Sequence, residues 1–215
     1  MRVTIILIFI SSIAYSQANY LEDGERGAYL GLGLYSGNNQ TDLLLGGGFS
    51  PNGLFEISGA LQRATIDEDF GLRNAYGLGL NAHLKYFVIK QSDIPLQLDL
   101  TVGSGIGRVT SDEIKAIDWD ITSFGYSIGS NVYYDIESNT NISIQPYGSI
   151  HYNVTKIKVD TNGFGSENDS DTKINFSLGV NLLLDLDYNN FAISPQIIFQ
   201  EGGTRFGIQL SYIFR

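Results

Sequence analysis

Cysteine is absent from the sequence, and histidine, proline and basic residues are scarce. Without cysteine the chain has no disulfide framework, no thiolate metal site and no lipid-attachment site after an export signal. Lys and Arg number 13 against 23 Asp and Glu, so the formal net charge is −10. This excess of acid argues against nucleic acid or another polyanion as the main partner. Stability must therefore come from packing or from a membrane.

The N-terminus has the three-part layout of a cleavable secretory signal. Arg2 is the basic start, residues 3–13 form an apolar run, and Ala14 and Ser16 are the small residues before a cleavage site. The apolar run is well short of the roughly 20 residues that a membrane-spanning helix needs. We expect residues 1–16 to be removed.

Alternation of apolar and polar residues with a period of two dominates the rest of the chain. From Lys173 to Tyr188, for example, the even positions are apolar or aromatic and the odd positions are mostly polar or small. Several alternating segments exceed 14 residues, whereas a globular strand has about 5–6 and a tilted membrane strand needs about 9–11. Ten segments are predicted to be strands: residues 27–36, 41–50, 53–63, 74–90, 95–110, 117–136, 141–159, 172–188, 190–200 and 203–214.

Two kinds of connection alternate between these strands. Tight turns rich in Asn, Asp and Pro follow the even strands, and mostly longer acidic segments follow the odd ones, among them residues 65–73, 111–116 and 160–171. Outer-membrane barrels combine short periplasmic turns, longer external loops and an even strand number. The predicted fold class is therefore all-β, a closed antiparallel up-and-down transmembrane barrel of about ten strands, with eight as the alternative. It covers residues 27–215, and residues 17–26 are expected to form a short periplasmic tail.

Aromatic residues are expected to form two girdles at the membrane interfaces. The set beside the short turns is Phe49, Phe55, Tyr86, Tyr134, Tyr188, Phe191, Tyr212 and Phe214, and the set toward the other ends is Tyr76, Trp119, Phe124, Tyr152, Phe176 and Phe206.

The last strand carries a terminal pattern, polar-x-Gly-x-x-apolar-x-aromatic-x-aromatic, in Arg205, Gly207, Leu210, Tyr212 and Phe214. It resembles the signal by which barrel proteins are handed to the outer-membrane assembly machinery. The mature chain as a whole resembles small outer-membrane barrels of the OmpA-transmembrane, OmpX and OmpW kind. The resemblance implies an outer-membrane location, contact with lipid and lipopolysaccharide, and an assembly role for these terminal residues. Those relatives mostly have eight strands and end on the aromatic itself, whereas Arg215 follows here.

If the apolar face meets lipid, the opposite face lines a polar lumen. Charges in such a confined interior must pair or be hydrated. Glu56 and Lys85 are expected on neighbouring strands at similar distances from the periplasmic rim, so we expect them to pair. The interior of a barrel of this size is narrow enough to be filled by side chains, which favours a polar plug over a small water-filled pore. The predicted cluster is Glu56, His83, Lys85, Asp99, Asp135, His151, Asp185 and Arg205.

Signals for catalysis or metal binding are weak. Both histidines fall near the middle of predicted strands, and the Gly-x-Ser-x-Gly motif is absent apart from a fragment around Ser104, which is expected to face lipid. The segment from Asp160 to Asp171 echoes a calcium loop, but Phe164 occupies a ligand position and Asp171 replaces the bidentate Glu. We predict no enzyme, no metal and no cofactor, and we interpret this segment as a solvated, flexible external loop.

Arg63 and Arg108 share the lipid-facing parity at the outer ends of their strands. They are candidate contacts for lipopolysaccharide phosphates, and snorkelling at the rim explains them as well. The leading interpretation is a non-enzymatic envelope barrel with a structural or surface-binding role through its external loops. The alternatives are a narrow channel or transport component, and a secreted soluble barrel of the lipocalin kind.

Overall fold

The computed structural model describes residues 21, 24–37, 39–66, 75–90, 95–116, 119–136, 141–161, 165–186 and 189–214. These residues form one short helix, α1 (Asp112–Ala116), and the strands β1 (Gly27–Gly37), β2 (Gln40–Ser50), β3 (Phe55–Ile66), β4 (Tyr76–Lys90), β5 (Leu96–Thr110), β6 (Trp119–Tyr134), β7 (Ile142–Thr161), β8 (Gly165–Leu186), β9 (Asn189–Gln200) and β10 (Gly203–Phe214). No helix in these ranges is long and apolar enough to cross a membrane. The predicted signal peptide lies outside them.

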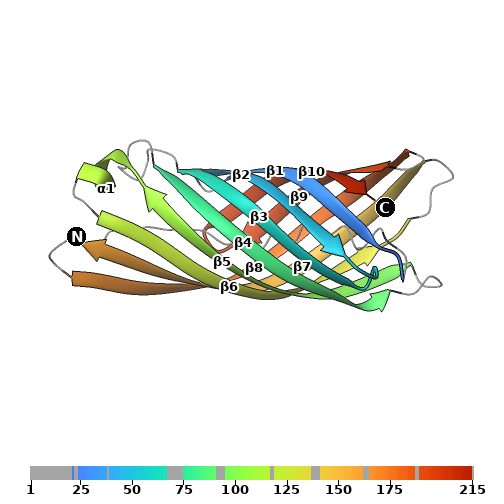
Figure 1. Cartoon of the computed structure of the whole chain (residues 1–215), viewed down its shortest axis with the longest axis horizontal. Coiled ribbons are helices and arrows are strands. Elements are labelled where there is room, and N and C mark those ends of the chain that lie inside the picture. Colours follow the sequence, from blue (N-terminus) through green and yellow to red (C-terminus); the bar gives the residue numbers. More distant parts are fainter. Residues whose placement is uncertain are drawn as a thin grey trace.

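Every strand pairs antiparallel with its neighbours in the chain, and β1 pairs with β10, so the sheet closes into a barrel. The closing seam runs from Ala28 opposite Phe214 to Ser36 opposite Phe206. Figure 1 shows the strands tilted around the barrel, with α1 at one end and the C-terminus at the other. The predicted ten-strand up-and-down barrel is confirmed, and the eight-strand count of the resembling proteins does not apply.

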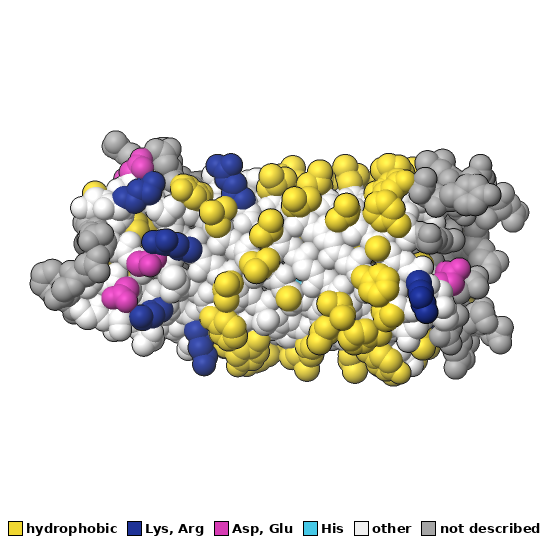
Figure 2. Space-filling view, viewed as in Figure 1, with side chains coloured by type: hydrophobic (Ala, Val, Ile, Leu, Met, Phe, Trp, Pro, Cys, Tyr) yellow, Lys and Arg dark blue, Asp and Glu magenta, His cyan; other side chains and the backbone are white. Residues whose placement is uncertain are grey.

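The alternation of the sequence separates the two faces of the wall. Along β1, Leu30, Leu32 and Leu34 are about half exposed on the outside, while Tyr29 and Tyr35 are buried inside. The same division continues around the barrel, and Figure 2 shows apolar side chains as a broad band on the outer surface. Because the side-chain period of a strand is two, one parity rule assigns nearly every position to a face.

The hairpin of β7 and β8 corrects one expectation. Residues 165–171 were expected to belong to an external loop, but they are strand residues that pair with residues 155–161 of β7. The pairing of β8 with β9 begins only at Phe176, so the outer part of this ribbon extends past the end of β9. Residues 162–164, including Phe164, lie outside the described residues.

A small apolar cluster lies inside the end of the barrel that carries α1. The backbone N–H of Ile114 in α1 donates to the Ser111 hydroxyl, an N-cap that starts the short helix at 3.1 Å. Ile114 then packs with Ile121 and Ile157, and Trp119 packs against this cluster. Trp119 therefore has the inward parity of β6, and its assignment to the outer aromatic girdle was wrong.

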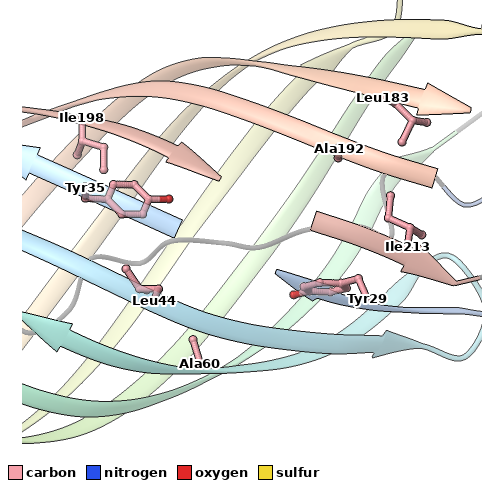
Figure 3. Close-up of a cluster of buried hydrophobic side chains, with 8 residues drawn as sticks. All are labelled: Tyr29, Tyr35, Leu44, Ala60, Leu183, Ala192, Ile198 and Ile213. Atoms are coloured by element: carbon pink, nitrogen blue, oxygen red, sulfur yellow. The ribbon is translucent and has the colours of Figure 1, made fainter. Parts of the chain in front are cut away.

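The lumen is not uniformly polar. The inner faces of β1, β2, β3, β8, β9 and β10 contribute a buried apolar cluster, drawn in Figure 3, of Tyr29, Tyr35, Leu44, Ala60, Leu183, Ala192, Ile198 and Ile213. The polar residues Asn81, His83, Lys85, Asp99 and Asn131 are buried on β4, β5 and β6. The interior thus contains both apolar and polar clusters, and polar groups such as Arg205 and Asp42 also lie near the closing seam.

Glycines create the room for the large inward rings. His151 lies directly opposite Gly129 on the neighbouring strand, and Tyr147 lies opposite Gly179. A Cβ atom at Gly129 would overlap the imidazole of His151 and also approach the Ile150 carbonyl oxygen to 2.6 Å. By contrast, a Cβ atom at Gly148 would meet Leu178 at an ordinary distance of 3.5 Å. Rings packed in the narrow interior therefore explain why glycine stands at these positions.

We predict that Gly129→Ala destabilises the barrel by about 1–3 kcal/mol, the usual cost of overpacking a filled interior. Gly148→Ala serves as the matched control and is expected to leave stability within about 0.5 kcal/mol of the parent. The measurement is the urea midpoint of the refolded protein in detergent. Equal midpoints for the two variants would show that the interior has free space at His151.

Candidate functional site

The centre of the polar lumen is the ion pair of Lys85 and Asp99. The Lys85 Nζ atom lies 3.3 Å from Asp99 Oδ2, and both side chains are almost fully buried. Lys85 also donates to the Tyr133 hydroxyl at 3.1 Å. Because each ion would lose its hydration in this interior, both need such partners.

Neutral donors complete the environment of the Asp99 carboxylate. Asn131 Nδ2 donates to Asp99 Oδ1 at 2.6 Å, and the Thr101 hydroxyl donates to the same oxygen at 3.1 Å. The Asn131 side chain also contacts His151, whose Nε2 atom lies 3.2 Å from Asn131 Oδ1. The network therefore links residues of β4, β5, β6 and β7 across the lumen.

The expected ion pair of Glu56 with Lys85 is corrected by this geometry. The register does place Glu56 directly opposite Lys85. However, the carboxylate in salt-bridge contact with Lys85 belongs to Asp99, and Glu56 accepts a hydrogen bond from the Tyr29 hydroxyl at 3.2 Å. Register alone did not predict the pairing, because the long lysine side chain reaches diagonally rather than straight across.

A second buried ion pair joins β2 and β10, close to the closing seam. Arg205 Nη2 donates to Asp42 Oδ2 at 2.5 Å, with both side chains almost completely buried. Gln40 Nε2 donates to the other oxygen of the Asp42 carboxylate. Arg205 was predicted to face the lumen, but Asp42 was missed, although its parity, opposite to that of the outward residues Leu43 and Leu45, would have identified it.

The remaining members of the predicted cluster are placed as follows. Asp135, just after β6, accepts hydrogen bonds from Gln97 at 2.6 Å and from Gln145 at 2.5 Å. His83 is buried against Gly103. Asp185 belongs to β8, but its side chain lies outside the described residues. The structure thus brings Lys85, Asp99 and His151 into one network and places Arg205 in a separate one.

This arrangement offers little for catalysis or metal binding. Both imidazoles are buried inside the lumen, away from either rim, and Ser104 is exposed on the outer wall. Within the described ranges, no group of three or more His, Asp or Glu side chains could hold a metal ion. Asp160 and Asp171 sit on paired strands, opposite Ser166 and Thr155, rather than in one loop.

A second set of functional side chains lies on the outside of the wall, at the α1 end of the apolar band. Figure 2 shows lysine and arginine side chains gathered there. Arg63 and Arg108 are exposed at this end, as predicted, and Arg63 lies over the Tyr76 ring at 5.9 Å. Lys156 and Lys158 of β7 share this outward face. These two lysines were not predicted, because only the arginines had been considered as phosphate contacts.

The terminal residues form the last strand of the closing seam. Leu210 and Phe214 are exposed on the outer face of β10. Tyr212 packs edge-on against Phe191 and Phe214, with ring centroids 4.9 and 4.7 Å apart. Gly207 accommodates the inward Tyr35 ring. The assembly signal predicted from these residues thus coincides with a strand that is required for closure, while its role in recognition stays a prediction.

The outer surface decides which kind of barrel this is. A soluble barrel of the lipocalin kind would have an apolar interior and a polar outer face, whereas here large apolar side chains cover the outside and paired ions lie inside. Exposed apolar surface of this extent is not stable in water but suits a hydrocarbon environment. The chain is an outer-membrane-type β-barrel.

Comparison with known proteins agrees with this fold. No protein-family model matches the chain, and no curated protein matches it. The β domain of the Bordetella autotransporter BrkA superposes with a TM-score of 0.57 at 11% identity, covering 90% of this chain and 100% of that one. Lower TM-scores are found for the translocator domain of the autotransporter NalP from Neisseria meningitidis (0.48, 8% identity, 88% and 86% covered) and for Ail, the attachment invasion locus protein of Yersinia pestis (0.36, 13% identity, 90% and 100% covered). At these identities the likeness concerns the fold alone.

We predict strong coupling between Lys85 and Asp99. Lys85→Met or Asp99→Asn alone should each cost about 3–5 kcal/mol of unfolding free energy, because the remaining ion stays buried without its partner. The double variant should lose clearly less than the sum of the two, as measured by a double-mutant cycle in urea. The matched control is Lys158 with Asp160, an exposed pair at 3.1 Å, whose coupling should stay below about 1 kcal/mol. Additive losses at Lys85 and Asp99 would contradict the buried ion pair.

Proposed function

We propose that this chain is an integral outer-membrane protein of a Gram-negative envelope, without enzymatic activity, whose outer end makes surface contacts. The observation that carries the proposal is the outward apolar band on a wall that closes through β1 and β10. A closed sheet leaves no unpaired edge in the hydrocarbon, which is the condition for a β-structure to span a membrane. We further propose that residues 1–16 are removed after export.

The filled lumen argues for a structural or binding role rather than a transport role. Tyr35, Phe87 and Arg205 are almost fully buried inside it, and they extend from different strands around the wall. Side chains of this size fill a barrel of ten strands, whose interior is only slightly wider than that of an eight-stranded one. A narrow channel, the alternative from the sequence, would require these side chains to move.

We propose that the end carrying α1 and the β7–β8 hairpin faces the exterior. At this end the hairpin extends beyond the neighbouring β9, and exposed polar residues such as Ser166, Asn168 and Ser170 lie on it. The opposite end, where β10 ends beside the start of β1, then faces the periplasm. This arrangement gives the exterior the larger surface for contact.

Location and orientation are tested by epitope tags in the full chain. A tag inserted just before Gly165 should be labelled by antibody on intact cells, and the same tag within residues 137–140 should be labelled only after permeabilisation. The protein should also stay with the membranes after carbonate extraction.

The opposite labelling pattern would show an inverted barrel. Recovery of the protein in the soluble periplasmic fraction, with neither tag labelled on intact cells, would overturn the proposed location.

A further inference from the structure

Cations and apolar residues are arranged in two neighbouring rows across the outer wall. In the first row, the register places Leu78 opposite Arg108, Arg108 opposite Thr122, and Thr122 opposite Lys158. In the second row, Ile106 lies opposite Phe124, and Phe124 lies opposite Lys156. All of these positions have the outward parity. The rows therefore join three cations to an apolar floor on four consecutive strands.

The outer wall is hollowed along these rows. A groove of about 930 Å³ runs from β3 to β8, and its floor includes Leu61, Leu78, Leu80, Ile106 and Phe124. Its volume is in the range of about 300–1,000 Å³ that is usual for ligand sites. These floor residues belong to the outward apolar band, so the groove continues into the surface that contacts hydrocarbon. A ligand that fits here has an apolar part of substantial length.

The polar wall of the groove is built to receive an anion. Arg108 Nε lies 2.9 Å from Asp120 Oδ1, which holds the guanidinium while its terminal nitrogens remain available as donors. Lys158 lies 3.1 Å from Asp160 Oδ2. Neighbouring strands are about 4.8 Å apart, so the backbones of Arg108 and Lys158 are separated by roughly 10 Å, with the short side chain of Thr122 between them. A phosphate placed over Thr122 would meet donors from both sides.

Lys156 adds a further cation one row closer to the apolar band. Among the described residues it forms no salt bridge, and its side chain is exposed. The carboxylate of Asp169 also borders the groove, but Asp169 lies opposite the buried Ile157 and so has the inward parity of the ribbon. Along the wall, Asp120 and Asp160 therefore lie nearest the solvent. The three cations follow, and the apolar floor lies beyond them.

We propose that this groove binds one phosphorylated, multiply acylated lipid of the outer leaflet, a glycolipid of the lipid A class. Its phosphate is held by Arg108, Lys156 and Lys158, and one acyl chain lies over Ile106 and Phe124. Charge complementarity and continuity with the apolar band select this occupant. Because the cations and the apolar floor come from defined positions on four neighbouring strands, the bound lipid is a specific ligand rather than part of the general lipid surroundings. This inference rests on the proposed outer-membrane location and orientation.

The test is native mass spectrometry of the full mature protein, purified in detergent and mixed with diphosphoryl lipid A. The parent should retain one lipid A, and Lys156→Gln with Lys158→Gln should lower the retained fraction about tenfold through loss of charge-assisted contacts. Phe124→Ala should lower it a few-fold through loss of apolar contact. Lys173→Gln is the matched control: it removes one positive charge from the same ribbon on its inward side, where Lys173 pairs with Asp171, and should retain lipid A like the parent.

Phosphatidylcholine and inorganic phosphate are the comparison ligands. The proposal expects phosphatidylcholine to be retained far less than lipid A, and inorganic phosphate at millimolar concentration to leave lipid A bound. Equal retention of both lipids, displacement by inorganic phosphate, or undiminished binding by the double lysine variant would each overturn it. A heat-dependent gel shift confirms that each variant is folded. Failure of lipid binding by a folded, membrane-located barrel would leave the proposed function intact, so the two outcomes are distinguishable.

Discussion

A strand that crosses hydrocarbon must pair its backbone N–H and C=O groups within the protein, because lipid offers no partners. In this chain that requirement is met by the pairing of β1 with β10, which brings residues separated by nearly the whole barrel domain side by side. Once the seam is closed, the even and odd positions of each strand lie on opposite faces of one continuous wall. The outward positions meet lipid and the inward positions meet one another, so the remaining features of the molecule depend on closure.

The narrow interior explains the chemistry found there. Arg205 and Lys85 are tolerated because Asp42 and Asp99 lie within salt-bridge distance, and neutral donors such as Asn131 and Gln40 occupy the other carboxylate oxygens. The rings fit because glycines stand opposite them. Apolar side chains, including Leu183 and Ile213, pack against one another near the seam. Charge pairing and apolar packing together fill the lumen.

Most of the fold could be predicted from period-two alternation, because parity and strand length are properties of the sequence alone. The β7–β8 hairpin was mispredicted, since Ser, Asn and Asp favour turns locally, while pairing with β7 holds residues 165–171 in a strand. Trp119 was predicted to belong to a girdle because it is aromatic, although its parity along β6 places it inside the barrel. The choice of Glu56 over Asp99 as partner of Lys85 failed for another reason: side-chain reach inside the barrel is a three-dimensional property. The groove on the outer wall likewise depends on side chains that the strands from β3 to β8 bring together.

Closure of the wall is tested most directly by disulfide cross-linking, which the absence of cysteine makes unambiguous. Leu32 on β1 lies opposite Leu210 on β10, and facing residues of antiparallel strands are within the Cα separation that a disulfide needs. The variant Leu32→Cys with Leu210→Cys should form an intramolecular disulfide in the membrane under mild oxidation. It should do so as readily as Leu32→Cys with Leu45→Cys, which reports the β1–β2 pairing, while Leu32→Cys with Leu178→Cys should not cross-link. Cross-linking across β1 and β2 but not across β1 and β10 would contradict the closed barrel.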